Sequence, residues 1–392
     1  MAPSRPSLTS AGPEGRPASG GGGRLWRAAA LLFGLSLGLA CLIGARAAAG
    51  PALAQAWPPF VLVLGLLLIG ARAHQDGLFA YAGQGMSRLP GSPLAIYVAA
   101  MALTAGVTVV LNLDTSAAFV TPVLVHLARR RGLSESRLLY GCVFMSNAAS
   151  LLLPGSNLTN LLVLGGQGVN GLAYLMRMLP PFTASVLTTA VVVALLFRAQ
   201  PGEPEQSAPA PRPHPLAVLP VLGAAALMLA LSRPSLPVLA LGLGVWVLGG
   251  RGVASWRIPL RSVDVGSLAS VFLLALALGT LARLWSLPGR LMATASGPAS
   301  AAIAAGASVL INNLPAAVLL GSNSPAHPVS LLLGLDLGPN LAVTGSLSAL
   351  IWWQAASQVG ARPSAWRYSM AGVILVPISL LAALAALHTP LR

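Results

Sequence analysis

Two aspartates lie inside apolar segments, whereas the other acidic residues lie in tails, linkers or loops. The chain has eight acidic residues, of which Asp114 in LNLDTSAAF and Asp336 in LGLDLGPN are flanked by apolar runs. A carboxylate inside a membrane costs roughly 2.5–3.5 kcal/mol on insertion scales, so such a residue usually has a function. Either could bind a coupling cation or carry a proton. The alternative is that each caps the N-terminus of a half-helix, and the following Gly338-Pro339 favours this role for Asp336.

Amide and hydroxyl residues interrupt the same apolar runs, as in PGSNLTN at 154–160. Unpaired polar groups are costly in hydrocarbon, so these interruptions need an explanation. At a broken helix, Asn and Ser groups can replace water around a small solute or cation, and half-helix N-termini can accept an anion. The alternative is that they only pair freed backbone groups. The candidate binding residues are Asn112, Asp114, Thr115, Ser156, Asn157, Asn160, Asn312, Asn313, Asp336, Thr344 and Ser346.

The other reactive residue types form no recognisable catalytic or metal site. The five His residues have no ligand spacing, and Cys41 and Cys142 form neither a metal cluster nor a disulfide framework. The segment GGQGVNG at 165–171 lacks the Lys-Ser/Thr pair of a phosphate-binding loop. We therefore predict no cofactor and no enzymatic activity. A membrane-embedded enzyme or assembly factor would need a constellation of this kind.

The composition places the polar interruptions in a polytopic membrane protein. The chain of 392 residues is 56% hydrophobic and 8% charged, against about 25% charged residues in soluble domains. Several apolar runs approach the roughly 20 residues that span a bilayer. The net charge of +15 comes from Arg alone, and short Arg-bearing loops indicate positive-inside topology rather than nucleic-acid binding. We expect a multi-pass protein of a prokaryotic plasma membrane with a cytoplasmic N-terminus.

Polar stretches divide the chain into two predicted transmembrane repeats. Residues 1–23, rich in Pro, Ser and Gly, predict a disordered tail. The Pro-rich linker 199–214 separates a first repeat, 24–198, from a second repeat, 215–392. Segment 74–90, HQDGLFAYAGQGMSRLP, predicts a helix at the membrane interface.

The arginine pattern predicts a re-entrant hairpin over 93–128. If the basic loops around Arg88 and Arg130 are both cytoplasmic, this segment cannot make a net crossing of the membrane. Two ordinary spans with a tight outer turn are the alternative, but a turn at Asp114 would leave unusually short arms. Arg233, Arg283 and Arg290 do not fit the resulting topology.

A weak internal repeat predicts a second hairpin over 293–330. VLNLDTSAA at 110–118 resembles LINNLPAAV at 310–318, and PGSNLTNLL at 154–162 has a counterpart in VTGSLSALI at 343–351. The hairpins would open to opposite sides. We therefore predict an all-α inverted-repeat secondary transporter with two re-entrant hairpins, two broken transmembrane helices and about 9–10 full spans.

Three stretches together resemble the arsenite/antimonite efflux permease family of the ion transporter superfamily. They are LNLDTSAAFVTPVL at 111–124, SNAASLLLPGSNLTNLL at 146–162, and INNLPAAVLLG with GLDLGPNLAVTGSLSALIWW at 311–321 and 334–353. The resemblance implies export of trivalent arsenic or antimony as the neutral hydroxide by proton antiport, with Asp114 carrying the proton. The implied partners are the bilayer, a small inorganic solute and a coupling ion, H⁺ or Na⁺. A homodimer and a separate ATPase subunit stay open.

Two positions depart from the pattern of that family. Asn147 in SNAAS stands where the family commonly has Asp, and Leu335 stands where it usually has Cys. A second function therefore stays open, namely Na⁺- or H⁺-coupled transport of a small carboxylate or inorganic anion on the same fold.

Overall fold

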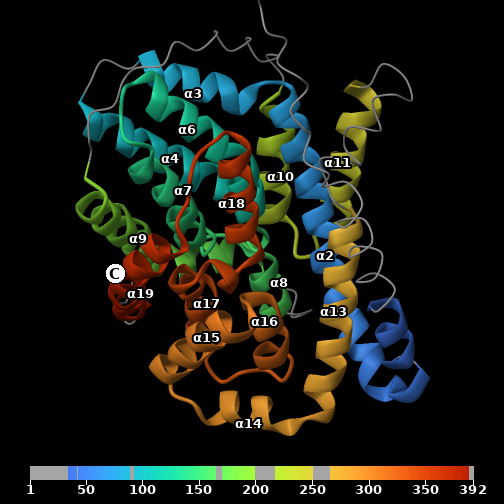
Figure 1. Cartoon of the computed structure of the whole chain (residues 1–392). Coiled ribbons are helices and arrows are strands. Elements are labelled where there is room, and N and C mark those ends of the chain that lie inside the picture. Colours follow the sequence, from blue (N-terminus) through green and yellow to red (C-terminus); the bar gives the residue numbers. More distant parts are fainter. Residues whose placement is uncertain are drawn as a thin grey trace, which may run out of the picture.

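The computed structural model describes residues 34–41, 43–88, 92–164, 170–198, 217–249 and 265–387. Every regular element within these residues is helical (Figure 1), which confirms the predicted all-α fold. The tail 1–23 and the linker 199–214 lie outside the described residues.

The first half contains a long helix, a short helix, a hairpin, a broken helix and another long helix. Polar residues separate the pieces of the hairpin and of the broken helix, as the sequence predicts. The elements are α2 (Arg46–Gln75), α3 (Leu78–Arg88), the hairpin of α4 (Pro93–Val110), α5 (Leu113–Thr115), the π-helical turn η1 (Ser116–Val120) and α6 (Thr121–Arg130), the broken helix of α7 (Glu135–Ala149), η2 (Pro154–Ser156) and α8 (Leu158–Leu164), and α9 (Gly171–Leu196).

The second half repeats this order after two additional helices. The additional helices are α10 (Leu219–Ala230) and α11 (Ser235–Gly249). The repeated elements are α13 (Val265–Leu284), α14 (Ser286–Thr294), the hairpin of α15 (Gly297–Ile311) and α16 (Asn313–Gly321), the broken helix of α17 (Pro328–Leu337), η4 (Gly338–Leu341), η5 (Val343–Gly345) and α18 (Leu347–Gln358), and α19 (Ala365–Leu387).

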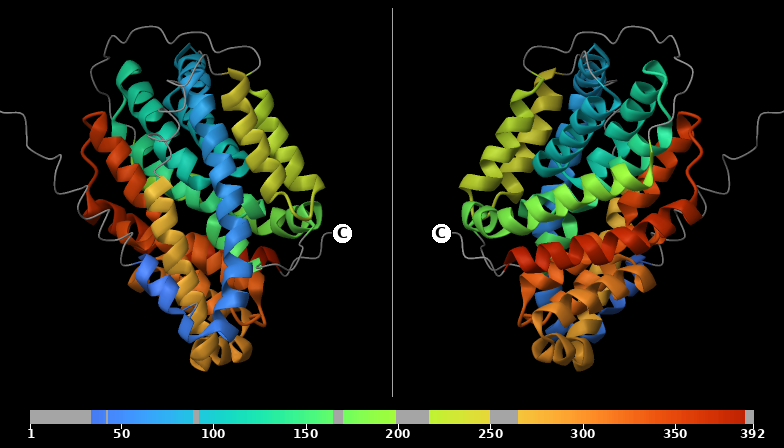
Figure 2. Two further views of the ribbon diagram at one scale, coloured as in Figure 1. Left: turned by 90° about the vertical axis from the view of Figure 1, so that its right-hand side faces the viewer. Right: turned by 90° about the vertical axis from the view of Figure 1, so that its left-hand side faces the viewer.

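The two sets of elements run in opposite directions. In Figure 1, α2 runs upward to α3, whereas its packing neighbour α13 runs downward to α14. The short helices α3 and α14 therefore lie at opposite ends of the molecule. In Figure 2 the last helices of the two sets, α9 and α19, run side by side across it. This arrangement is that of an inverted-repeat transporter.

Five described helices are long and apolar enough to cross a membrane: α2, α4, α9, α13 and α19. Shorter apolar helices include α10, α11 and α15. The protein is therefore a multi-pass membrane protein. In segment 93–128 the first arm, α4, has 18 residues, and the second arm consists of the shorter η1 and α6.

The predicted interfacial helix starts later than the sequence indicates. His74 belongs to α2, which continues to Gln75, and α3 begins at Leu78 after a turn at Gly77 with a φ of 79°. Arg131 after α6 donates from Nη1 to the carbonyl oxygen of Ser87 in α3, over 2.9 Å. The start and the end of the first hairpin therefore lie at the same end of the molecule.

Small residues allow close backbone contact where the second hairpin meets the second broken helix. Gly334 lies against the carbonyl oxygen of Ala301, and a Cβ on Gly338 would come within 2.5 Å of the Cα atom of Ala305. The two glycines are four residues apart in sequence, and so are the two alanines. The contacts therefore form a seam along one face of α15 and one face of α17. Gly372 in α19 lies equally close to the backbone of the adjacent turn η4. The second broken helix is thus held tightly on two sides.

Candidate functional site

Each half-helix that follows a break begins with a side-chain cap. Asn112 accepts a hydrogen bond from the Thr115 amide at 2.7 Å, and Asn157 accepts one from the Thr159 amide at 3.1 Å. In the second half, Asn312 accepts from the Leu314 amide at 3.3 Å and Ser346 from the Ala349 amide at 3.2 Å. Asn and Ser are favoured at such positions because their oxygen satisfies an otherwise unpaired backbone N–H. Part of the polar pattern in the breaks is therefore structural.

Each hairpin also contacts the break of its own repeat. The Ser156 hydroxyl donates to the carbonyl oxygen of Val109, at the end of α4, over 2.9 Å. In the second half, Asn312 Nδ2 donates to the carbonyl oxygen of Thr344 over 2.9 Å. A hydrogen bond thus joins hairpin and break in each half, but the break donates it in the first half and the hairpin donates it in the second.

The backbone differs between the two hairpin tips. Asn112 is extended, with a φ of 177°. Asn312 has a φ of 75° and a ψ of 149°, a left-handed conformation that a residue with a Cβ rarely adopts. The hydrogen bonds that Asn312 makes to both sides hold it in this conformation.

Asp336 is completely buried and joins the two repeats. Its Oδ1 atom accepts hydrogen bonds from Asn157 Nδ2 at 2.7 Å and from the Thr159 hydroxyl at 3.0 Å. Its Oδ2 atom has no partner among the described residues. Asp336 lies in the last turn of α17 and caps no helix N-terminus, so the capping hypothesis is wrong for this residue. A buried carboxylate oxygen without a partner points to a ligand or a proton.

A chain of hydrogen bonds extends from this region through the first break to the second. Asn160 Nδ2 donates to the carbonyl oxygen of Ser150 at 2.8 Å, and the Ser150 hydroxyl donates to that of Asn147 at 2.9 Å. Asn147 Nδ2 then donates to Asn340 Oδ1 at 2.7 Å. We call Asn147, Ser150, Asn157, Thr159, Asn160, Asp336 and Asn340 the central polar cluster.

The central polar cluster contains several buried atoms that have no partner among the described residues. They include two amide oxygens, Asn147 Oδ1 and Asn160 Oδ1, and one amide donor, Asn340 Nδ2. The hydroxyl of Tyr174, in the first turn of α9, is also buried without a partner. Together with Asp336 Oδ2, these atoms offer both donors and acceptors to a small hydroxylated solute or a coupling ion.

A second set of polar atoms lies at the first hairpin tip. Asn112 Nδ2 and the Thr115 hydroxyl are buried and make no hydrogen bond within the described residues. Asp114 is half-buried, and no hydrogen bond joins it to Asp336. The first tip therefore presents its own group of unpartnered polar atoms.

The structure brings together only some of the residues that the sequence singled out. Asn157, Asn160 and Asp336 belong to the central polar cluster, whereas Asn112, Asp114 and Thr115 lie at the first tip. Asn312 and Asn313 lie at the second tip, where Asn313 is buried, and Thr344 in the second break is exposed. The residues that the list of candidate binding residues lacked are Asn147, Ser150, Thr159, Tyr174 and Asn340. Of these, Asn340 follows Asp336 within GLDLGPN, and Thr159 follows Asn157 within PGSNLTN.

Charged groups other than Asp336 are absent from the described residues of the central polar cluster. No group of three or more His, Cys, Asp or Glu residues in the described ranges could hold a metal ion. Arg283 in α13 donates to Gln55 of α2 at 2.6 Å, and Gln55 donates to the carbonyl oxygen of Leu162 in α8 at 2.8 Å. Arg283 does not follow the positive-inside rule because its guanidinium is hydrogen-bonded within the helix bundle. Through Gln55 it connects α13 to α2 and α8.

Long helices in inverted order, hairpins and broken helices with buried polar groups define a secondary transporter. The citrate transporter family matches residues 25–334, and the chain belongs to this family.

Curated relatives match most of the chain at low identity. It is 24% identical over 375 residues to the arsenical pump membrane protein of Escherichia coli K12, with 84% of this chain and 86% of the relative covered. It is 26% identical over 356 residues to the inner membrane protein YbiR of the same organism, covering 90% and 92%. The uncharacterized transporter Rv2684 of Mycobacterium tuberculosis is 24% identical, with 86% of each chain covered.

A solved structure shares the fold. The YdaH transporter of Alcanivorax borkumensis superposes with a TM-score of 0.55 at 12% identity, covering 93% of this chain and 97% of the other. At this identity the likeness concerns the fold alone.

Proposed function

We propose that the protein exports trivalent arsenic or antimony, as the neutral hydroxide, in exchange for protons across a prokaryotic plasma membrane. The observation that carries this proposal is the chemistry of the central polar cluster. It offers one carboxylate together with uncharged amide and hydroxyl groups. Such a set suits a small neutral polyol, whose hydroxyl groups both donate and accept hydrogen bonds.

The surroundings of the cluster favour a neutral cargo over an anion. An anion inside a membrane protein is normally held by a cation or by a free helix N-terminus. Among the described residues, no Arg belongs to the central polar cluster, and its half-helix N-terminus at α8 is capped by Asn157. Arsenic held by thiolates is also disfavoured, because Cys142 is buried in α7 and contacts Thr121 at 3.5 Å, with no second Cys beside it among the described residues.

Asp336 is the proposed proton carrier. Its Oδ1 atom is held by Asn157 and Thr159, whereas its Oδ2 atom is free to take up or release a proton. Asp336 lies just before the second break, and it accepts its hydrogen bonds from Asn157 and Thr159 at the first break. A change in its charge therefore affects the contact between the two breaks. Asp114, which the family resemblance implies as carrier, lacks this link to the second repeat.

The names of the relatives support this cargo. Of the seven curated proteins that match, four are called arsenical pump membrane proteins, each at 24% identity. The family description names citrate instead. A small carboxylate is therefore the second candidate cargo, and the first hairpin tip favours it, because the unpartnered Asn112 Nδ2 and Thr115 hydroxyl can donate hydrogen bonds to its oxygens.

Transport into everted membrane vesicles tests the proposal. We expect arsenite and antimonite to accumulate when the vesicle interior is acidic, without a requirement for Na⁺. The Asp336→Asn variant should reduce this uptake to the level of empty vesicles, because Asn preserves the side-chain shape and one acceptor but carries no exchangeable acid proton. Asp76→Asn, which removes only an interfacial pair with Arg72, is the matched control and should retain uptake. Uptake of citrate without any arsenite transport would contradict the proposal.

A further inference from the structure

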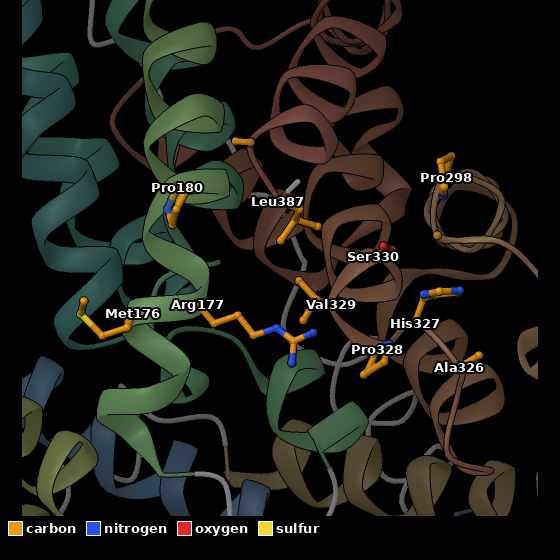
Figure 3. A pocket seen from close by; sticks show the side chains of 12 residues that line it. Met176, Arg177, Pro180, Pro298, Ala326, His327, Pro328, Val329, Ser330 and Leu387 are labelled. Carbon is orange, nitrogen blue, oxygen red and sulfur yellow. The ribbon is translucent and has the colours of Figure 1, made fainter. Parts of the chain in front are cut away.

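A polar cavity of about 370 Å³ lies between α9, α15, α17 and α19, and no residue of the central polar cluster lines it. Figure 3 shows Arg177 extending from α9 towards Val329 and Leu387. His327 and Ser330 lie beyond Val329 as seen from Arg177. No acidic residue lines this cavity within the described part of the chain. Its polar groups are therefore suited to an anion.

Two helix N-termini meet at this cavity. Its lining includes Gly297, the first residue of α15, and Pro328, the first residue of α17. His327 precedes α17 without making a side-chain cap, so the first amides of this helix keep their hydrogen-bonding capacity. At α15, the Ser296 hydroxyl already accepts a hydrogen bond from the Ala299 amide, so α17 provides the uncapped helix N-terminus at this cavity.

Ser330 provides an independent sign of a ligand. Its side chain is 7% exposed and lines the cavity, yet it makes no hydrogen bond within the described residues. A Cβ on Gly297 would come within 3.1 Å of Ser330 Oγ, so glycine leaves space beside this hydroxyl. A buried hydroxyl beside two helix N-termini can donate to an anionic oxygen.

The apolar walls indicate what kind of molecule carries the anion. Met176, Pro180 and Leu387 line the cavity together with the cationic groups. Leu172, Met176 and Leu179 form an exposed apolar stripe along α9, and Met176 belongs both to this stripe and to the lining of the cavity. A ligand with a charged head and an apolar tail matches this combination.

We propose that this cavity binds the phosphate group of an anionic phospholipid, with Arg177, His327 and Ser330 as its side-chain ligands. The acyl chains would lie along the apolar stripe of α9. The lipid would connect α9 to the N-termini of α15 and α17, and α17 carries Asp336 at its other end. This site is independent of the identity of the cargo.

Lipid-dependent thermal unfolding of the purified full-length protein in a neutral detergent tests the proposal. We expect phosphatidylglycerol to raise the unfolding temperature more than phosphatidylcholine does. The Arg177→Gln/His327→Gln variant should bind phosphatidylglycerol about tenfold more weakly or worse, as expected when a charge-assisted hydrogen bond is lost. Arg177→Lys should retain most of the effect. The control is Arg290→Gln, because Arg290 is an exposed cation of α14 outside the cavity.

The outcomes separate the lipid from other ligands and from misfolding. The unfolding temperature without lipid shows whether each variant is folded. An equal loss in the Arg290 variant, or no preference for phosphatidylglycerol over phosphatidylcholine, would overturn the proposal. Glycerol 1-phosphate provides the soluble form of the same headgroup. If it stabilises the protein as well as the lipid does, the assignment to a lipid is wrong.

Discussion

At the scale of single residues, the central polar cluster is built from pairs that span the two repeats. Asn157 and Asp336 are 179 positions apart, and Asn147 and Asn340 are 193 apart, yet each pair is joined at 2.7 Å. Buried polar groups of this kind are costly when one partner is removed, because the other loses its compensation. The pairs therefore contribute to stability as well as to the proposed binding of cargo.

A double-mutant cycle on Asn147 and Asn340 measures this contribution. Each single change to Ala leaves a buried amide without its partner and should lower the free energy of unfolding by about 1–3 kcal/mol. The double variant should lose less than the sum, with a coupling of about 0.5–3 kcal/mol. Thermal or denaturant unfolding in detergent provides the measurement. Strictly additive losses would contradict the direct contact between the two side chains.

At the scale of elements, the contact between α15 and α17 determines where Asp336 lies. The glycine–alanine seam brings the two backbones together, so any added volume at Gly334 or Gly338 must separate the helices. Gly306, on the same helix as Ala301, has no atom within 4 Å of the position of a Cβ. These glycines therefore offer a matched comparison between a packed and an open site.

Gly334→Ala and Gly306→Ala should have opposite effects on stability. The added methyl group at Gly334 meets the Ala301 carbonyl and should cost about 1–3 kcal/mol, as overpacking does. At Gly306 the methyl group enters open space, and Ala should stabilise the helix by up to about 1 kcal/mol. Unfolding temperatures of the two variants check this comparison. Equal destabilisation by both would show that the seam is not where the helices touch.

The sequence predicts the elements better than the contacts between them. The breaks at PGSNLTN and GLDLGPN are visible because polar residues are costly within apolar runs. The start of α3 is less visible, since HQDG is polar whether it ends α2 or begins the next helix. Asn340 and Tyr174 escape detection because their significance depends on which segments meet in space. No local pattern indicates that Asp336 would contact the first break rather than cap a helix of its own.

At the scale of the whole molecule, the antiparallel packing of α2 and α13 sets the topology. It places α3 and α14 at opposite ends of the molecule (Figure 1). The last turn of α6 lies beside α3, because Arg131 donates a hydrogen bond to the carbonyl oxygen of Ser87. Because Arg129, Arg130 and Arg131 lie at the same end as α3, the positive-inside rule predicts that this end is cytoplasmic. The short helices should therefore face different compartments.

Cysteine accessibility in whole cells tests this arrangement. Gly85→Cys in α3 and Ser136→Cys at the start of α7 should resist a membrane-impermeant maleimide, whereas Arg290→Cys in α14 should react. Gly85 and Arg290 are both exposed, so burial does not explain a difference between them. Permeabilised cells provide the control, because the cytoplasmic position Gly85→Cys should then react as well. Labelling of Gly85→Cys and Arg290→Cys from the same side would contradict the inverted arrangement.

The unequal backbones of the two hairpin tips have a consequence for the transport cycle. The left-handed conformation of Asn312 stores on the order of 1–3 kcal/mol, whereas the extended Asn112 stores no comparable strain. A movement that separates the second tip from Thr344 would release this energy, and the equivalent movement of the first tip would not. The two hairpin tips of this pseudo-symmetric protein therefore differ in backbone strain before any cargo or gradient is present. Its resting population should favour opening on one side of the membrane.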